Sequence, residues 1–591
     1  MMVCSLTRFC YVWRLFWYRS TMNKKGFFSL ICLLILSIAS AQKYPQNYFQ
    51  SPLDIPLYVS GTFGELRSNH FHAGIDLKTQ GQEGKRVLAA AEGYISRINV
   101  SSSGYGKAIY INHPNGFMTV YAHLQRFNEE IEAYVREHQY RKETFELTLY
   151  PSPGQLKVSQ GQVIALSGNT GGSGGPHLHY EIRDQGGERA LNPLLFGLNI
   201  NDRRAPKLFR VKLYEIDHEG NIRDERVVDI APGSNGIYRP VNQTSIKLHN
   251  TFAVGVQGYD HQDGSENKNG IYRVVVLVND TAYFSFQADG IRFDQSRYIN
   301  AFVDYPAKKN KGQTYYRLYE MPNYNLDAHP ERKERGIIHI NDSGSFTLKM
   351  EALDFHGNRS EVHIPLDLMC KDFSSRFGSA TVWQYSMSNT INDGGIRATL
   401  APMSLYEDAV IEYKIEETCS NCLTPVFGIG RTDIPIHRNL MVSFDRSLIE
   451  SDLPREKMVV VRRDHAGAKW QSIGADENNS NHLMAYSKTF GQFSVMSDLI
   501  APRVYPINFG DGQSISDNKP IHIHISDDFS GISKYAAYVN DEWILMEYEP
   551  KSNLLFYTFD GKLSKGKNTL RLVVWDNCNN KTEKTWSIVR P

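Results

Sequence analysis

The stretch that decides the architecture is residues 168–184, Gly-Asn-Thr-Gly-Gly-Ser-Gly-Gly-Pro-His-Leu-His-Tyr-Glu-Ile-Arg-Asp, where a glycine-rich loop runs into an alternating segment. Alternation predicts a β-strand, in which successive side chains point to opposite faces. His177 and His179 therefore share one face, and Leu178 and Tyr180 share the other. Two imidazoles on one face can supply two metal ligands, or one ligand and a neighbouring base, if a third group arrives from elsewhere.

The third group is expected from residues 69–76, Asn-His-Phe-His-Ala-Gly-Ile-Asp, where His72 and Asp76 lie four positions apart. A further histidine, His123, follows an alternating run that predicts a hairpin around Pro114-Asn115-Gly116. His72, Asp76 and His179 form an N, O, N ligand set that leaves the fourth zinc position open for water, as a catalytic zinc requires. His177 and His123 remain as acid/base groups.

These segments resemble the M23 (lysostaphin/LytM-type) zinc metallopeptidases, which cleave peptide cross-bridges of bacterial cell walls. The matching motifs are His-x3-Asp (72–76), Tyr-Ala-His-Leu (121–124) and Gly-Pro-His-Leu-His (175–179). The resemblance implies an antiparallel β-sheet groove, one Zn²⁺ per chain on His72, Asp76 and His179, and catalytic roles for His177 and His123. No element of the pattern is missing, whereas some members of that family have lost ligands and act only as activators.

Other histidines were weighed against this set. His70 lies two residues from His72, but its spacing to Asp76 does not match the family, so a surface or supporting position is expected. His522 and His524 form another same-face pair without a glycine-rich approach or a His-x3-Asp partner, and we expect no site there.

The amino terminus predicts export. Residues 22–25 are Met-Asn-Lys-Lys, an apolar run follows from 27 to 38, and Ala39-Ser40-Ala41 resembles a cleavage site, so translation is expected to start at Met22 and the mature chain at Gln42. The apolar run is too short for a membrane-spanning helix. We expect a periplasmic, envelope-associated or secreted protein. In that oxidising setting Cys419 and Cys422 are expected to form a disulfide.

The chain is predicted to be mainly β, with an M23-type antiparallel sheet domain followed by about three β-sandwich domains of immunoglobulin-like type. The expected divisions are a leader at 1–41, a peptidase domain at 42–200, and β domains at 201–373, 374–498 (topology unassigned) and 499–591. One helix is expected near residues 128–142, either as a packing helix or as part of a lid over the substrate groove, since the insertion 126–160 is longer than a hairpin needs.

The first and last β domains are predicted to be two copies of one module, because their turn signals repeat in the same order. The first copy has Ala205-Pro206, Gly270-Ile271, Asn279-Asp280 and a closing turn at 354–358, and the second has Ala501-Pro502, Gly531-Ile532, Asn540-Asp541 and 576–580. Within the first copy, Asp260, Asp263 and Glu266 form an acidic loop that could hold calcium, but they lack EF-hand spacing, so we expect a solvated turn.

We therefore predict a zinc-dependent endopeptidase that hydrolyses peptide cross-links of bacterial peptidoglycan with metal-activated water. Its predicted partners are peptidoglycan stem peptides and envelope proteins bound by the C-terminal β domains. The 65 Lys and Arg residues nearly balance the 64 Asp and Glu residues, so a nucleic-acid partner is not expected. The alternative is a catalytically silent wall-binding activator or scaffold of other cell-wall hydrolases. Because the zinc pattern ends before Phe196, residues 205–591 are expected to be dispensable for the chemistry.

Overall fold

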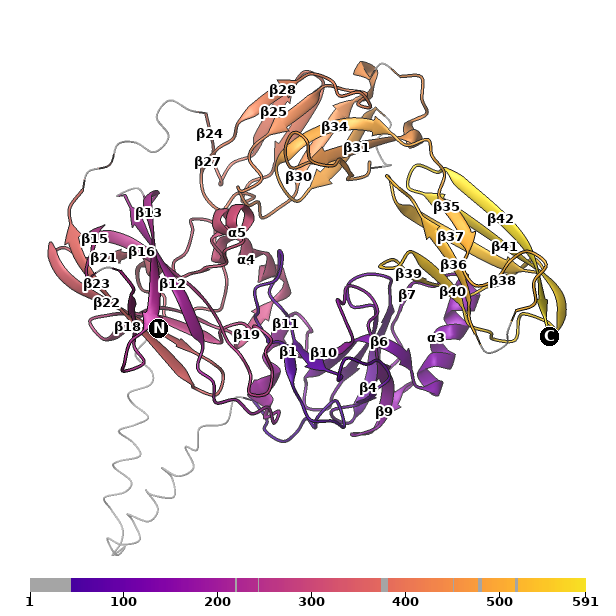
Figure 1. Cartoon of the computed structure of the whole chain (residues 1–591), viewed down its shortest axis with the longest axis horizontal. Helices are drawn as coiled ribbons and strands as arrows, with labels where there is room; N and C mark the ends of the chain where they lie inside the picture. Colours follow the sequence, from indigo (N-terminus) through magenta and orange to yellow (C-terminus); the bar gives the residue numbers. More distant parts are fainter. Residues whose placement is uncertain are drawn as a thin grey trace, which may run out of the picture. The chain divides into compact units, whose positions relative to one another are not determined.

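The computed structural model (Figure 1) describes residues 44–217, 220–242, 244–371, 373, 381–449, 451–476, 481–515 and 519–591. The expected signal peptide and its cleavage site lie outside the described residues. The chain divides into two units at Tyr48, and the second unit, Phe49–Pro591, is mainly β and holds all the elements named below. Within the described residues, no helix is both long enough and apolar enough to cross a membrane.

The histidine motifs lie in a twelve-stranded antiparallel sheet. Its main path is β1 (Val59–Gly61), β2 (Ile75–Lys78), β10 (His177–Arg183), β6 (Met118–Phe127), β5 (Lys107–Asn112), β4 (Gly93–Val100) and β7 (Leu147–Leu149). The other strands are β3 (Arg86–Leu88), β8 (Lys157–Val158), β9 (Val163–Ser167), β11 (Arg189–Leu191) and β19 (Gly290–Arg292). Behind the histidines, Tyr180 of β10 lies opposite Tyr121 of β6, and both are fully buried. Burial of each ring stabilises this face by about 1.5–3 kcal/mol.

The predicted helix is α3 (Glu129–Lys142), which Asn128 caps by accepting a hydrogen bond from the Ile131 N–H at 3.0 Å. Of the residues whose spacing predicts the helix, Ile131 and Val135 are buried and Tyr134 and His138 are half-buried; Gln139, outside that pattern, is buried as well. Tyr140, on another part of the helix, contacts Trp543 of the last β domain with ring centroids 5.3 Å apart. The helix therefore also contacts the last β domain.

Residues beyond position 204 complete the first sheet. Strand β19 pairs with β11 and extends the sheet. The Phe71 ring, between His70 and His72, packs against Phe286 and Phe302 with centroids 6.3 and 5.8 Å apart. The Phe71 N–H also donates to the Ser296 hydroxyl at 3.1 Å. The loop that carries His72 therefore contacts the downstream domain, which bears on the expectation that residues 205–591 are dispensable for the chemistry.

The next region forms an eleven-stranded, mostly antiparallel arrangement. It contains β12 (Lys207–Ile216), β13 (Ile222–Pro232), β14 (Tyr238–Pro240), β15 (Ile246–His249), β16 (Thr251–Tyr259), β17 (Arg273–Val278), β18 (Thr281–Gln287), β20 (Tyr316–Arg317), β21 (Ile338–His339), β22 (Gly344–Leu353) and β23 (Arg359–Met369). Two short helices, α4 (Ile299–Phe302) and α5 (Tyr305–Lys311), lie between β19 and β20.

Each of the two remaining regions packs its sheets around one core, with three sheets in the first region and two in the last. The first contains β24 (Val382–Trp383), β25 (Asn389–Asp393), β26 (Ile396–Leu400), β27 (Ala409–Val410), β28 (Tyr413–Glu416), β29 (Val426–Ile429), β30 (Leu440–Asp445), β31 (Met458–Arg463), β32 (Gln471–Ser472), β33 (His482–Ser487) and β34 (Gly491–Ser497). The last contains β35 (Arg503–Pro506), β36 (Ile521–Ser526), β37 (Ile532–Val539), β38 (Glu542–Ile544), β39 (Glu547–Glu549), β40 (Leu554–Tyr557), β41 (Gly566–Asp576) and β42 (Lys581–Arg590).

The predicted repeat is visible in matching hydrogen bonds. In the first copy the Asn358 amide donates to Asp354 at 2.6 Å and to the Asp202 carbonyl at 3.1 Å. In the second copy the Asn580 amide donates to Asp576 at 2.8 Å and to the Asp498 carbonyl at 3.0 Å. Both copies also have an Asn-Asp hairpin turn with two positive φ angles, the geometry of a type I′ turn.

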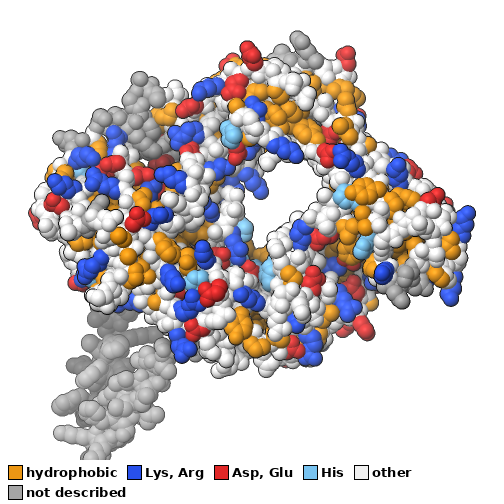
Figure 2. Space-filling view, in the orientation of Figure 1, with side chains coloured by type: hydrophobic (Ala, Val, Ile, Leu, Met, Phe, Trp, Pro, Cys, Tyr) orange, Lys and Arg blue, Asp and Glu red, His pale blue; other side chains and the backbone are white. Residues whose placement is uncertain are grey.

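The predicted Cys419–Cys422 disulfide is present. Cys370 is exposed and Cys578 is buried, and both are free. Figure 2 shows Lys and Arg side chains interspersed with Asp and Glu over the face that it draws, in keeping with the formal net charge of +1.

Candidate metal centre

Strand pairing brings the two motif segments together. Antiparallel pairing of β10 with β2 places His179 directly opposite Asp76. The other edge of β10 pairs with β6, where His179 lies opposite Ala122, next to His123. His72 approaches from the loop before β2. Histidine and carboxylate positions more than 100 residues apart therefore meet because three strands are neighbours in one sheet.

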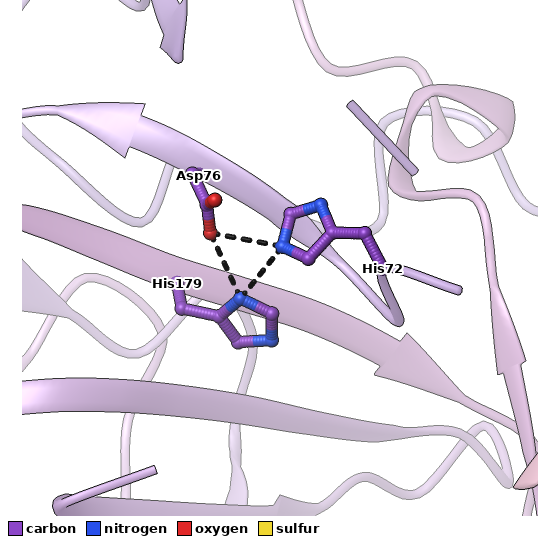
Figure 3. A group of neighbouring side chains, drawn as sticks. All are labelled: His72, Asp76 and His179. Carbon is purple, nitrogen blue, oxygen red and sulfur yellow. Dashed lines mark hydrogen bonds and ion pairs between the residues drawn. The ribbon is translucent and has the colours of Figure 1, made fainter. Parts of the chain in front are cut away.

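The side chains of His72, Asp76 and His179 converge on one point (Figure 3). His72 Nε2 lies 3.0 Å from Asp76 Oδ1 and 3.0 Å from His179 Nδ1, and His179 Nδ1 lies 2.9 Å from Asp76 Oδ1. All three residues are buried. Two imidazole nitrogens and one carboxylate oxygen are a donor set that suits zinc.

Each ligand histidine is held by its other ring nitrogen. His72 Nδ1 lies 2.8 Å from the Thr62 carbonyl oxygen, and His179 Nε2 lies 2.8 Å from Glu181 Oε1. An acceptor at that nitrogen fixes the ring orientation and directs the remaining nitrogen inward, as metal-binding histidines require. The residues present thus fit a bound zinc ion in both their donors and their support.

His177 and His123 lie beside this group. Their ring centroids are 4.8 Å apart, and His177 Nε2 lies 3.4 Å from Asp76 Oδ1. His177 Nδ1 bonds to the Gly175 carbonyl at 2.8 Å and His123 Nδ1 to the Thr170 carbonyl at 2.9 Å. His123 has φ of 59°, a left-handed conformation that costs a non-glycine residue about 1 kcal/mol or more. The fold keeps this backbone conformation where the imidazole is aimed at the site.

The charges in the metal-free site are strongly coupled. Burial raises the pKa of Asp76, but His72 and the hydrogen bonds from His177 and His179 outweigh it and hold that pKa well below its usual range. Burial lowers the pKa of His179, but its bonds to Asp76 and Glu181 prevail and raise it to about 9. Burial, with smaller effects of His179 and His177, lowers the pKa of His123 to about 3. His123 is therefore neutral at physiological pH.

The sequence patterns missed several supporting residues. Glu181 is fully buried; it accepts from Tyr105 OH at 2.5 Å and from Arg183 Nε at 2.6 Å. Arg67 Nη2 donates to Asp76 Oδ2 at 2.9 Å. Glu181 and Arg183 continue the face of His177 and His179 at two-residue spacing, a signal that extending the alternation would have revealed. Arg67 carries no comparable signal.

The other weighed residues lie outside the centre. His70 is exposed and bonds to the Ser68 carbonyl through Nδ1 at 2.9 Å. Neither His522 nor His524 belongs to a group of converging donor atoms in the described part of the chain.

Comparisons with known proteins match this region. The family "Peptidase family M23" matches residues 70–140 and 150–193, and the family "Zu5-like domain" matches residues 380–498. DD-carboxypeptidase/endopeptidase Mpg of Neisseria meningitidis is 31% identical over 177 residues, which cover 30% of this chain and 31% of that protein. An uncharacterized metalloprotease of Haemophilus influenzae is 34% identical over 155 residues, covering 25% of this chain and 27% of that protein. Murein hydrolase activator NlpD of Escherichia coli is 33% identical over 138 residues, 23% of this chain and 28% of that protein.

Among solved structures, the catalytic domain of lysostaphin from Staphylococcus simulans is 23% identical, covers 22% of this chain and 86% of that chain, and has a TM-score of 0.17. The matched part spans less than a third of the length of each sequence relative named above. Fold and site define a mainly β protein with a two-histidine, one-carboxylate donor set of the kind found in hydrolytic zinc sites. The domain that carries this donor set is similar to peptidase family M23, whose model matches residues 70–140 and 150–193.

Proposed function

We propose that this protein is a zinc-dependent endopeptidase that hydrolyses peptide cross-links of bacterial peptidoglycan. The observation that carries the proposal is the convergence of His72, Asp76 and His179, whose donor atoms lie 2.9–3.0 Å apart with every outward-facing histidine nitrogen bonded to a fixed acceptor. These residues would hold one Zn²⁺ per chain. Bound there, zinc supplies polarisation of the scissile carbonyl and acidification of a bound water.

His177 and His123 have separate roles in the proposed reaction. His177 has the most exposed side chain of the histidines that form ion-pair contacts in the site, 15% against 6–7% for His72 and His179, so it can exchange a proton with water and substrate. We assign it the role of general base. His123 is kept neutral by burial and donates its Nδ1–H to the Thr170 carbonyl, so its Nε2 is unprotonated. This nitrogen would assist proton transfer, and it would hold the developing oxyanion once it has taken up a proton.

The substrate class follows from the relatives rather than from the cavity shape. The names of the matched proteins refer to a DD-carboxypeptidase/endopeptidase and to a murein hydrolase activator, which supports peptidoglycan stem peptides as the substrate. The Cys419–Cys422 disulfide supports a location outside the reducing cytoplasm. The C-terminal β domains would then be available to bind envelope proteins.

The second candidate is a wall-binding activator without hydrolytic activity, which the similarity to NlpD favours. The two candidates differ at the donor set. An activator needs no intact ligands, whereas here all three are present and oriented. We therefore place hydrolysis first.

The test combines product analysis with zinc content. Purified peptidoglycan is digested with the mature chain, with and without a chelator, and new termini in the stem peptides are identified by mass spectrometry. His179→Ala should lose both zinc and turnover. His177→Ala should keep zinc and lose about 10²- to 10⁴-fold in turnover, the usual contribution of a general base. His522→Ala, from the same-face pair on β36, is the matched control and should change neither.

Two results would overturn parts of this proposal. A zinc-loaded wild-type protein that leaves all stem peptides intact would favour the activator. Loss of zinc from folded His177→Ala would make His177 a ligand and invalidate the division of roles along β10.

A further inference from the structure

A second cluster of polar groups lines a cavity between the first sheet and the following β domain. The cavity has a volume of about 40 Å³. Val59 and Thr62 lie on the side of the first sheet, and Asp202, Asp260, Asn269, Asp354 and His356 lie on the other. A single water needs about 10–15 Å³ of such space, so the cavity has room for an ion together with water.

The Asp354 carboxylate in this cavity is already held in place. Donor atoms of Asp202, Asp354 and His356 all lie within 4.8 Å of one another. The Asn358 backbone N–H and side-chain amide each donate to one oxygen of Asp354, at 2.8 and 2.6 Å. Each carboxylate oxygen has two lone pairs, so both oxygens retain a free acceptor position. The Asp354 carboxylate is therefore held in one orientation while both of its oxygens can still accept a ligand.

Two further oxygens in the cavity have no partner. Asp260 and Asn269 are 6% and 3% exposed, and Oδ1 of each is buried without a hydrogen bond. Their backbones face each other across a β-bridge, with N–H···O distances of 3.0 and 2.9 Å, so both side chains leave the same face. Acceptor oxygens buried without a donor are uncommon in folded proteins, and a bound ion or water can satisfy them.

The nearby arginines form their direct ion pairs with other acids. Arg203 bonds to Asp263 at 3.2 Å and Arg204 to Glu266 at 3.2 Å. These contacts involve two of the three acids weighed from the sequence as a calcium loop. The structure thus separates Asp260 from Asp263 and Glu266 and joins it to acids from distant parts of the chain.

The repeated module provides an internal comparison. In the last domain Asp498 and Asp576 contact the Asn580 amide as Asp202 and Asp354 contact the Asn358 amide, and Asp527 directly follows β36 as Asp260 directly follows β16. The donor atoms of Asp498, Asp527 and Asp576 lie within 4.8 Å of one another. Backbone N–H groups contact the first acid in both copies, since Asp202 Oδ1 accepts from Arg204 and Asp263 at 3.1 and 3.2 Å, and the copies differ at the second acid. Asp527 Oδ2 accepts from Phe529 and Gly531 at 3.0 and 2.7 Å, and Asp498 Oδ2 accepts from Ser530 at 3.1 Å. The first copy has a longer segment before Gly270 and leaves Asp260 Oδ1 without such a donor.

We propose that this cavity is a binding site for a hard divalent cation of the Ca²⁺ type, with oxygen ligands from Asp202, Asp260, Asn269 and Asp354. Carboxylate and amide oxygens are the ligands that calcium prefers. The ion would join the two domains next to the metal centre, because Thr62 lines the cavity, accepts from the Gly270 N–H through its hydroxyl at 3.0 Å, and bonds His72 through its carbonyl.

The test uses calcium alone on the full mature chain. Zinc-loaded protein, freed of calcium, is titrated with Ca²⁺ by calorimetry, and its melting temperature is measured with and without Ca²⁺. One Ca²⁺ per chain should bind at this site, and a hundredfold excess over the dissociation constant should raise the melting temperature by about 5 °C. Asp260→Asn, which keeps the shape of the side chain, should weaken binding at least about tenfold and remove the Ca²⁺-induced shift.

Matched controls separate this site from its neighbours. Asp263→Asn and Glu266→Gln alter the arginine-paired acids of the same loop, and Asp576→Asn alters the equivalent cluster of the last domain; all three should bind Ca²⁺ as the wild type does. Asp202→Asn repeats the test at a less buried ligand if Asp260→Asn does not fold. Three results would overturn the proposal: no Ca²⁺ binding by the wild type, unchanged affinity in a folded Asp260→Asn or Asp202→Asn, or loss of binding confined to a control.

Discussion

Replacement of Glu181 by glutamine should weaken zinc binding although Glu181 touches no metal. Its carboxylate is fully buried and forms three side-chain contacts, with His179 Nε2 at 2.8 Å, Tyr105 OH at 2.5 Å and Arg183 Nε at 2.6 Å. The negative charge strengthens the bond to His179 and fixes which nitrogen of that ring is turned toward Asp76. An amide keeps one acceptor oxygen but loses the charge.

The substitution should lower both zinc affinity and stability. Loss of a supporting partner of a metal-binding histidine costs about 10- to 100-fold in metal affinity, or about 1.4–2.7 kcal/mol. Once the Glu181 charge is removed, the buried Arg183 (8% exposed) has no carboxylate partner among the contacts that the structure describes. Its other contacts are the Tyr105 hydroxyl at 3.3 Å and the ring faces of Phe293 and Tyr110. Removing one member of a buried ion pair lowers the free energy of unfolding by about 3–5 kcal/mol. The glutamine side chain still offers one acceptor oxygen, so the loss for Glu181→Gln should lie near the lower end of this range.

Zinc affinity is measured by competition with a chelating dye, and stability by urea unfolding of the metal-free protein. Tyr105→Phe removes one hydrogen bond but keeps the charge, so it should cause a smaller loss of zinc affinity. Glu188→Gln, at an exposed position after β10 with its side chain 71% accessible, should change neither quantity. A folded Glu181→Gln protein that binds zinc with wild-type affinity would refute the supporting role of Glu181.

Three further outcomes are expected. First, zinc uptake should release about one proton per chain at pH 7–8 and none well above pH 9, because the pKa of His179 is raised to about 9 in the metal-free fold and zinc must displace that proton. Calorimetry in buffers of different ionisation enthalpy measures the number of protons released. Zero release at pH 7.5 would contradict the prediction. The same shift stabilises the metal-free fold fully below about pH 6.5 and is lost as pH rises through about 9. Second, the free energy of unfolding measured in urea should be ~1 kcal/mol higher for His123→Gly than for His123→Ala, because glycine adopts φ of 59° without strain. Both variants should lose hydrolysis. Equal stability of the two variants would mean that the backbone is unstrained there. Third, a fragment of residues 42–204 should fail to hold zinc and one of residues 42–373 should bind it, since β19 and the aromatic rings around Phe71 lie between these end points; zinc retention by the shorter fragment would show that the His72 loop orders itself.

Prediction from sequence succeeded where one short segment carries the information. Alternation in residues 177–180 assigns His177 and His179 to one face of a strand, and the structure has that strand as β10, with Leu178 and Tyr180 in the core. Helix α3 and the disulfide were predicted for the same reason, because a periodic stripe and a three-residue separation are local features. Resemblance to a known family joined the separate motifs into one candidate site.

Contacts between distant segments could not be derived in this way. The sequence shows that Phe71 is apolar, but nothing in its neighbourhood indicates that Ser296 holds its backbone or that Phe286 and Phe302 bury its ring. The acidic loop was judged on the spacing of Asp260, Asp263 and Glu266, whereas the fold pairs the latter two with arginines.

Local periodicity specifies which face of a strand or helix a side chain occupies, since it reflects backbone geometry that repeats every two or 3.6 residues. Other features depend on how elements far apart in sequence pack: which strands lie next to that strand, which loop supplies a missing ligand, and which oxygens have no donor. This packing follows from the shape and burial of many side chains together. His177 and His179 could therefore be placed on one face from their spacing alone, whereas the meeting of Asp202 with Asp354 beside Asp260 required the folded arrangement of two domains.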